Sequence, residues 1–158
     1  MTNFESLLST LVRHKVEFIV VGGAAAIAHG SSRLTQDLDI VYSRTPENLT
    51  CLVAALADYQ PYLRGVPPGL PFKWDQTVLS RGLNFTLVTS IGDIDLLGEI
   101  PGGGTYADLA PKAIEVQLFG TRCLCLSLVQ LIRAKRAAGR PKDLEALAEL
   151  EAIEDEQS

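Results

Sequence analysis

Apolar residues along the first 60 positions recur with the spacings of helices and buried strands. In residues 4–12 they return every three or four positions, which predicts an amphipathic helix that Thr2 or Asn3 can cap. Two continuous apolar runs predict buried strands, and an alanine-rich stretch between them predicts a short helix. Pro46 can begin a further helix, because a first-turn residue needs no N–H donor. The expected strands cover residues 16–21 and 38–42, and the expected helices cover residues 24–29 and 46–59.

The remainder of the chain starts with a long loop and then returns to regular elements. Residues 60–75 contain four prolines, and a loop of this length inside a compact domain is usually functional or mobile. Two strand pairs are expected next, followed by two helices that meet at Gly139 and Pro141. The strand pairs are residues 84–88 with 94–97, joined by a turn over 89–93, and residues 114–118 with 122–126. This order predicts an α/β (α+β) fold, a mixed β-sheet flanked by helices, with C-terminal helices.

Composition narrows the class of protein. The 158 residues suit one domain, expected over residues 1–158 with a C-terminal helical part over about 127–154. Hydrophobic residues make up 47% and charged residues 21%, which is typical of a globular protein. No apolar run reaches the roughly 18 residues of a membrane helix and the N-terminus lacks a signal-peptide pattern, so we expect a cytoplasmic location and no membrane. Three cysteines without a Cys-x-x-Cys pair indicate buried packing residues.

The charge of the chain bears on its partners. A formal net charge of −5 argues against broad, non-specific attraction to nucleic acid. It leaves room for a local basic patch near the C-terminus, although such a cluster can also be a plain solvated helix face. The cluster consists of Arg133, Lys135, Arg136, Arg140 and Lys142.

Asp37 and Asp39 are the clearest candidates for chemistry. Two positions apart on a strand, they project from the same face with Cα atoms about 6.5 to 7 Å apart. Their charges repel by about 1 kcal/mol at about 4 Å in water and about 4 kcal/mol at an effective dielectric constant of about 20. A divalent cation between them reverses the sign of this interaction, and their oxygen atoms suit Mg²⁺. Taken alone, such a pair is more often a solvated feature of an exposed strand.

Two companions strengthen the metal hypothesis. Gly22 and Gly23 stand between a buried strand and a helix, where backbone N–H groups can approach a phosphate, although a plain tight turn would also explain them. Asp95, in a second acidic strand, offers a third carboxylate that could complete a two-metal site or take the proton of a nucleophile. Asp93 is expected in the turn before it. Hairpin solubility is the alternative explanation of both acids.

These residues together resemble a known family. The segment from Gly22-Gly23 through Gly30-Ser31-Ser32-Arg33-x-Thr35 to Asp37-x-Asp39 resembles the nucleotidyltransferase signature of the polymerase-beta superfamily. More narrowly, the chain is similar to the short proteins grouped with AbiEii-type toxins of type IV toxin–antitoxin systems. That similarity extends to residues 84–89 and 93–97 and to Lys135-x4-Arg140-Pro141-Lys142-Asp143-Leu144.

The resemblance implies an enzyme that uses Mg²⁺ (or Mn²⁺) and a nucleoside triphosphate, with ATP among the candidates. It would transfer a nucleoside monophosphate to a hydroxyl of RNA or tRNA, a protein or a small molecule, and a cognate antitoxin would be a partner. The metal ligands and catalytic residues would be Asp37, Asp39 and Asp95. The nucleotide- and phosphate-binding residues would be Gly22, Gly23, Ser31, Ser32, Arg33, Lys135 and Asp143, the last orienting Lys135 or capping the final helix.

The chain departs from the family pattern in ways that leave alternatives open. Gly-Gly stands where Gly-Ser is frequent, thirteen residues separate Gly23 from Asp37, and AbiEii-type proteins are commonly much longer. A serine donor to the phosphates would therefore have to come from Ser31 or Ser32. A nucleotide- or partner-binding module of the same fold without turnover is the alternative function. An unrelated α/β domain with accidental acidic residues is the third hypothesis.

Overall fold

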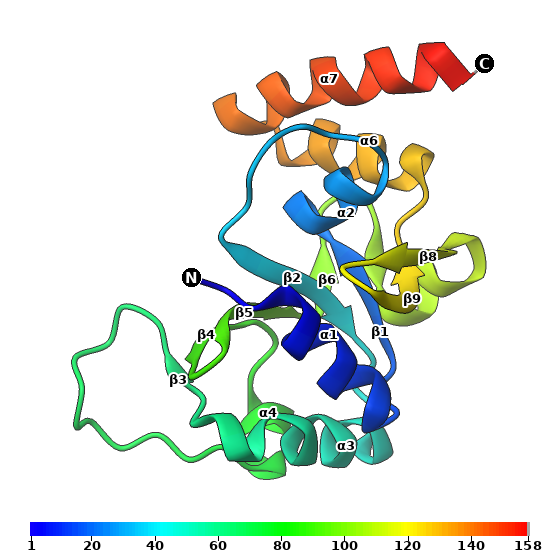
Figure 1. Cartoon of the computed structure of the whole chain (residues 1–158). Helices are drawn as coiled ribbons and strands as arrows, with labels where there is room; N and C mark the ends of the chain where they lie inside the picture. The colour runs from blue at the N-terminus through cyan, green and yellow to red at the C-terminus, as the bar shows by residue number, and fades with distance from the viewer. Residues whose placement is uncertain (158) are drawn as a thin grey trace.

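A seven-stranded mixed β-sheet in the order β3-β4-β5-β2-β1-β9-β8 forms the centre of the computed structural model, which describes residues 1–157 (Figure 1). β2 runs parallel to β5 and β1 runs parallel to β9, whereas the other neighbours are antiparallel. The expected mixed sheet is therefore confirmed. Its strands are β1 (Phe18–Val21), β2 (Asp37–Tyr42), β3 (Tyr62–Leu63), β4 (Phe85–Thr89), β5 (Gly92–Leu97), β8 (Ile114–Leu118) and β9 (Thr121–Cys125). A separate small hairpin pairs β6 (Glu99–Ile100) with β7 (Gly104–Thr105).

Helices flank the sheet, as expected. In Figure 1, α6 and α7 lie together beyond α2 at one end of the molecule, and α3 and α4 lie at the opposite end. α1 packs against both α3 and β9. The helices are α1 (Phe4–Arg13), α2 (Gly22–Ala28), α3 (Pro46–Leu56), α4 (Gln76–Arg81), α5 (Tyr106–Leu109), α6 (Leu128–Ala138) and α7 (Pro141–Gln157), with 3-10 turns at η1 (Ala57–Tyr59) and η2 (Ala110–Lys112).

Local sequence accounts for the ends and faces of these helices. The Asn3 side chain accepts a hydrogen bond of 3.0 Å from the Ser6 N–H and caps α1, whose leucines are fully buried. Ser127 and Gln130 cap α6 reciprocally. α6 ends at Gly139, which has the left-handed backbone (φ 64°) that favours glycine. The predicted caps and the apolar spacing of these helices are confirmed.

The position of Asp93 differs from the sequence prediction. The turn between β4 and β5 comprises only Ser90 and Ile91, and Thr89 pairs directly with Gly92. Asp93 therefore lies within β5, opposite Val88, and not in the turn. A two-residue connection is a standard hairpin geometry, and it places Asp93 in the sheet together with Asp95.

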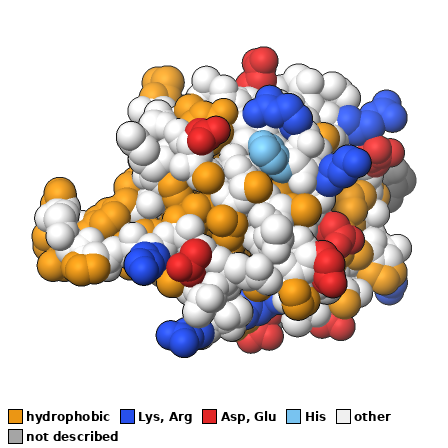
Figure 2. All heavy atoms as spheres, turned by 90° about the horizontal axis from the view of Figure 1, so that it is seen from below, with side chains coloured by type: hydrophobic (Ala, Val, Ile, Leu, Met, Phe, Trp, Pro, Cys, Tyr) orange, Lys and Arg blue, Asp and Glu red, His pale blue; other side chains and the backbone are white. Residues whose placement is uncertain are grey.

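The proline-rich segment is not a loop throughout. Residues 62–63 pair with residues 87–88 as β3, so the segment starts as the edge strand of the sheet. The part after β3 projects from the body, and hydrophobic side chains run along it in the view of Figure 2. α4 and α5, both short, were not predicted either.

Two expectations from composition can be compared with the structure. Cys123 and Cys125 are buried on β9, and burial raises the pKa of their thiols to about 11 and about 12 respectively. This agrees with a packing role. None of the helices described within residues 1–157 combines the length and the apolar character that crossing a membrane requires.

Candidate functional site

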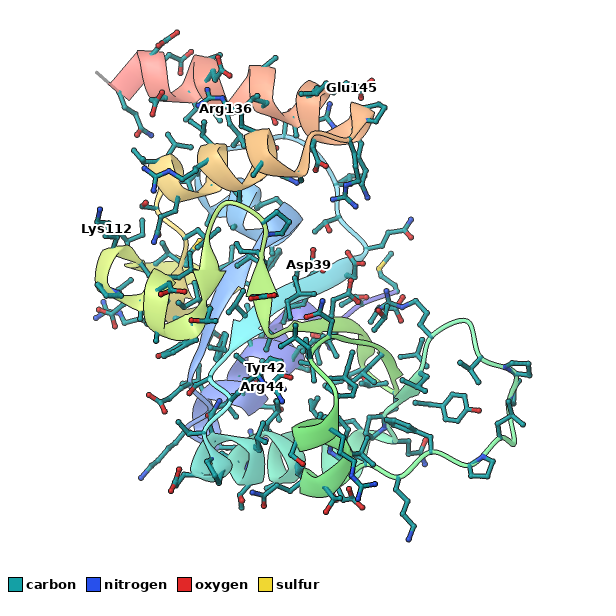
Figure 3. All side chains as sticks on the ribbon, turned by 180° about the vertical axis from the view of Figure 1, so that it is seen from behind. Asp39, Tyr42, Arg44, Lys112, Arg136 and Glu145 are labelled. Atoms are coloured by element: carbon teal, nitrogen blue, oxygen red, sulfur yellow. The ribbon has the colours of Figure 1, made fainter. Side chains whose placement is uncertain are left out.

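Two parallel strands bring the predicted acidic residues together. β2 and β5 pair in a register that sets Asp37 beside Asp93 and Asp39 beside Asp95. Side chains two positions apart share a face of a strand, so all four carboxylates gather along one side of the sheet. One carboxylate oxygen from each of Asp37, Asp39 and Asp95 lies within 4.8 Å of the other two. The convergence expected for these three residues is present, and Figure 3 shows Asp39 on the ribbon of β2.

The electrostatics at Asp39 are unfavourable without a cation. Its Oδ1 is buried, and no residue among 1–157 donates a hydrogen bond to it. Burial, followed by the charges of Asp37 and Asp95, raises the pKa of Asp39 to about 8. A buried oxygen without a partner calls for a missing ligand, and a hard divalent cation would satisfy it and reduce the repulsion. The residues present therefore fit a metal ion such as Mg²⁺.

Gly22 and Gly23 allow other atoms of the site to approach the backbone closely. Gly22 has φ 64°, and a β-carbon there would collide with the Asp39 carboxylate. A β-carbon on Gly23 would lie 2.7 Å from Thr35 Oγ1, and this hydroxyl donates a hydrogen bond of 3.2 Å to the Asp37 carbonyl. Packing of the acidic strand thus explains both glycines. Their contact with a phosphate stays a prediction.

Basic residues from α6 and from the turn before α7 line a cavity with Asp39. Lys135 Nζ lies 3.3 Å from Asp143 Oδ1, and Arg140 Nε donates a hydrogen bond of 2.6 Å to Asp143 Oδ2. The Asp143 side chain is only 1% exposed, and Arg140, together with Lys135, lowers the pKa of its carboxyl group. Gly22, Asp39, Lys135 and Arg140 line one cavity of about 140 Å³. Asp143 is thus placed to orient both cations beside Asp39.

Of the predicted phosphate ligands, Ser31 and Ser32 face α7, whereas Arg33 contacts α7 and also lines a cavity with Asp37 and Asp39. Ser31 Oγ donates a hydrogen bond of 2.5 Å to Glu149, and the backbone N–H and hydroxyl of Ser32 donate to the same carboxylate at 3.3 and 3.2 Å. Arg33 lies 3.6 Å from Glu145. Their phosphate contacts stay a prediction.

Arg64 is the main site residue that the sequence analysis missed. It directly follows β3, and its guanidinium group lies 3.6 Å from Asp37, 3.5 Å from Asp93 and 2.8 Å from Asp95. Arg140 was recognised only as part of the basic cluster. No motif marks Arg64, because its position depends on the pairing of β3 with β4. The one signal in the sequence is the additional acid, Asp93, which needs a counter-charge once it lies in the strand.

The fold matches solved structures of nucleotidyltransferases. The lincosamide antibiotic adenylyltransferase LnuA, solved with lincomycin bound, is 17% identical; the match covers 96% of this chain and 98% of that chain, with a TM-score of 0.61. TM1012, a proposed nucleotidyltransferase from Thermotoga maritima, is also 17% identical, with 90% and 86% covered and a TM-score of 0.57. No protein-family model and no curated protein sequence matches the chain. At this identity the likeness establishes the fold, and the activity has to be argued from the site.

Proposed function

We propose that this protein is a magnesium-dependent nucleotidyltransferase that transfers a nucleoside monophosphate from a nucleoside triphosphate to an acceptor hydroxyl. The observation that carries the proposal is the convergence of Asp37, Asp39 and Asp95, in which Asp39 Oδ1 and Asp95 Oδ1 are buried without a hydrogen-bond partner among residues 1–157. The fold shared with LnuA supports the same reaction class. Mutually repelling carboxylates are costly to hold together, and binding of a cation supplies a reason to keep them.

The three aspartates would hold Mg²⁺, or Mn²⁺ in its place. Oxygen ligands, space for substrate phosphates and the unsatisfied charge of Asp39 all suit these ions. When bound, the ion supplies positive charge that offsets the carboxylates and the charge developing on the phosphate oxygens. The protein contributes mainly positioning and electrostatic stabilisation to such a transfer.

Lys135 and Arg140 would bind the triphosphate. They line the same cavity as Asp39 and Gly22, and among residues 1–157 the one carboxylate that pairs with both of them is that of Asp143. Positive charge is therefore available beside the acidic cluster for phosphate oxygens. Asp143 would keep both side chains pointed toward the nucleotide, and the backbone at Gly22 and Gly23 would lie next to the phosphates.

Asp95 would accept the proton of the acceptor hydroxyl. Burial raises the pKa of its carboxyl group more than the nearby Arg64 lowers it, which makes the carboxylate a stronger base than a solvated one. The acceptor oxygen would then form a bond to the α-phosphorus, the bond from that phosphorus to the bridging oxygen would break, and pyrophosphate would leave. The proton ends on Asp95, so the step balances.

The acceptor and the biological role are the finer parts of the proposal. LnuA, whose fold this chain matches over nearly its whole length, is a lincosamide adenylyltransferase and therefore modifies a small molecule. RNA or tRNA, protein and small molecules are all acceptor classes to be tested. The toxin role of an AbiEii-like protein with a cognate antitoxin rests on sequence resemblance alone. Expression in bacteria should then arrest growth, and Asp39→Asn should remove the arrest.

A second candidate is a nucleotide- or partner-binding module without turnover. The ion pairs that Arg64 makes with Asp37, Asp93 and Asp95 favour it, because an arginine at those carboxylates reduces the need for a metal ion there. Binding of magnesium and nucleotide without transfer would support this candidate.

The direct test is a transfer assay. The purified protein is incubated with Mg²⁺ and each of the four nucleoside triphosphates labelled at the α-phosphate, together with total RNA, lysate protein or a small-molecule fraction. We expect label in one fraction, and we expect Asp39→Asn to abolish it. Asp58→Asn, which changes an exposed aspartate on η1, is the matched control and should retain activity. Absence of label with every triphosphate would contradict the proposed function.

A further inference from the structure

Arg64 places a permanent positive charge inside the acidic cluster. Its Nη1 lies 3.6 Å from Asp37 Oδ2, its Nε lies 3.5 Å from Asp93 Oδ2, and its Nη2 lies 2.8 Å from Asp95 Oδ1. Each of the three guanidinium nitrogen atoms thus forms an ion pair with a different carboxylate, although Nε and Asp95 Oδ1 have no hydrogen-bond partner among residues 1–157. Arginine remains charged at any pH at which the protein is folded, so this compensation is always present.

The backbone and the sheet hold Arg64 in this position. Its N–H donates a hydrogen bond of 2.9 Å to the Thr86 carbonyl, which continues the pairing of β3 with β4. Its Nη2 also donates a hydrogen bond of 2.8 Å to the Leu87 carbonyl. Only 27% of the side chain is exposed. Moving Arg64 away would therefore break contacts to the sheet as well as three ion pairs.

Arg64 forms ion pairs with three of the four carboxylates in the cluster and none with the fourth, Asp39. It contacts Asp37, Asp93 and Asp95, whereas no ion pair joins any cation of residues 1–157 to Asp39. One arginine and one divalent ion would bring three positive charges to the four carboxylates. Two divalent ions would already match those four charges and leave Arg64 in excess beside them. Because the guanidinium group already lies against Asp95, and no ion pair joins a cation of residues 1–157 to Asp39, the geometry favours one ion near Asp39 over two.

We infer that Arg64 is the built-in second cation of this site: the protein binds one divalent ion at Asp37 and Asp39, and the guanidinium group takes the place beside Asp95 where a second ion would lie. The inference rests on the proposed function, and it replaces the two-metal site that the sequence suggested. Arg64 then acts as a positioning residue that fixes Asp95 for the acceptor hydroxyl. Asp93, which belongs to no predicted ligand set, has the role of fixing Arg64.

The number of bound ions tests this inference without measuring activity. Mn²⁺ alone is titrated into the metal-free full-length protein, and the free ion is followed by electron paramagnetic resonance. We expect one Mn²⁺ per chain for the wild type and two, a twofold rise, for Arg64→Met. Arg64→Gln, whose amide can still donate to the Leu87 carbonyl, should give the same rise if Arg64→Met does not fold. Circular dichroism checks the fold of each variant.

Arg122→Met is the matched control. It removes one positive charge from an exposed position on β9, two strands away from β2, and should leave one Mn²⁺ per chain. Two ions bound to the wild type would overturn the inference while leaving the metal site intact. One ion bound to both Arg64 variants would overturn it as well. Absence of Mn²⁺ binding in every protein would contradict the metal-dependent function and the inference together. One Mn²⁺ bound to a protein that transfers no label would contradict only the proposed function.

Discussion

The Oδ1 atom of Asp39 is buried, and no residue among 1–157 donates a hydrogen bond to it. Its carboxyl group gains a proton more readily in the folded protein than in the unfolded chain, because burial and then two neighbouring carboxylates oppose ionisation. Asp39 therefore makes the metal-free fold sensitive to pH. Below a pH of about 8 this carboxyl group is therefore mostly protonated in the metal-free protein, and a bound cation would favour its ionised form.

The metal-free protein should lose stability as the pH rises from about 4 to about 8. The pKa of Asp39 is raised from 3.8 to about 8, so the folded protein binds more protons than the unfolded chain across this window. The free energy of unfolding must then fall with pH, by at most about 1.4 kcal/mol per pH unit for one group. Urea unfolding in EDTA measures it. Asp39→Asn should flatten the slope, and a stability that rises over this window in the wild type would contradict the assignment.

Gly22 is the glycine next to the acidic cluster at which a side chain should be poorly tolerated. Alanine there has to adopt φ 64° and also displaces the Asp39 carboxylate. The backbone alone costs about 1–2 kcal/mol, and the collision adds to it. Gly120→Ala is the matched control, because Gly120 has φ 78° with open space around it. We expect both variants to be destabilised but only Gly22→Ala to lose Mn²⁺ binding; equal Mn²⁺ binding by the two would show that Gly22 does not shape the site.

For single residues, the sequence predicts positions that depend only on neighbours within the same helix or strand. The spacing of Asp37 and Asp39 on one strand suffices to place both carboxylates on one face. Ser31 and Ser32, by contrast, contact Glu149, which lies more than a hundred residues away and is brought close only by the packing of α7. Arg64 was missed for the same reason. A side chain whose partners belong to distant elements has no signature in its own neighbourhood.

The parallel pairing of β2 with β5 is the element-level feature on which the site depends. It sets Asp39 beside Asp95, whereas a shift of one residue would turn one strand's acids to the opposite face. α1, β1, β2 and α6 could be predicted because their apolar spacing and caps are strong local signals. β3, α4 and α5 span two to six residues, and elements this short are stable only through their tertiary contacts.

Asp143 should hold α6 and α7 together. Its buried carboxylate pairs with Lys135 on α6 and with Arg140 before α7, and Asp143→Asn removes the charge from both pairs. We expect a loss of about 1–3 kcal/mol in the free energy of unfolding, measured by urea titration, and weaker binding of a nucleoside triphosphate. Glu151→Gln is the control, because its pair with Arg136 is exposed at 63% and 46% and should contribute about 0–1 kcal/mol. Equal effects of the two substitutions would contradict this role.

Across the whole molecule, the site is assembled from segments that are far apart in the chain. The acids proposed to bind a metal come from β2 and β5, the close glycine from the start of α2, and the basic residues from α6 and the turn before α7. In Figure 3 Asp39 lies on β2 of the sheet, and the two C-terminal helices lie above it. The fold class could be predicted because a short glycine–acid signature marks it. The AbiEii-like subtype and the single domain over residues 1–158 stay predictions.

The proposal that Asp39 binds a nucleotide through Mg²⁺ is best tested by measuring the binding of a magnesium–nucleotide complex. Calorimetry with a non-hydrolysable nucleoside triphosphate compares the wild type, Asp39→Asn and the exposed control Asp58→Asn, each with Mg²⁺ and with EDTA. We expect the wild type and Asp58→Asn each to bind one nucleotide per chain, and to do so only when Mg²⁺ is present. Asp39→Asn should bind at least about tenfold more weakly, equivalent to about 1.4 kcal/mol. Binding of equal strength by Asp39→Asn, or binding that persists in EDTA, would contradict it.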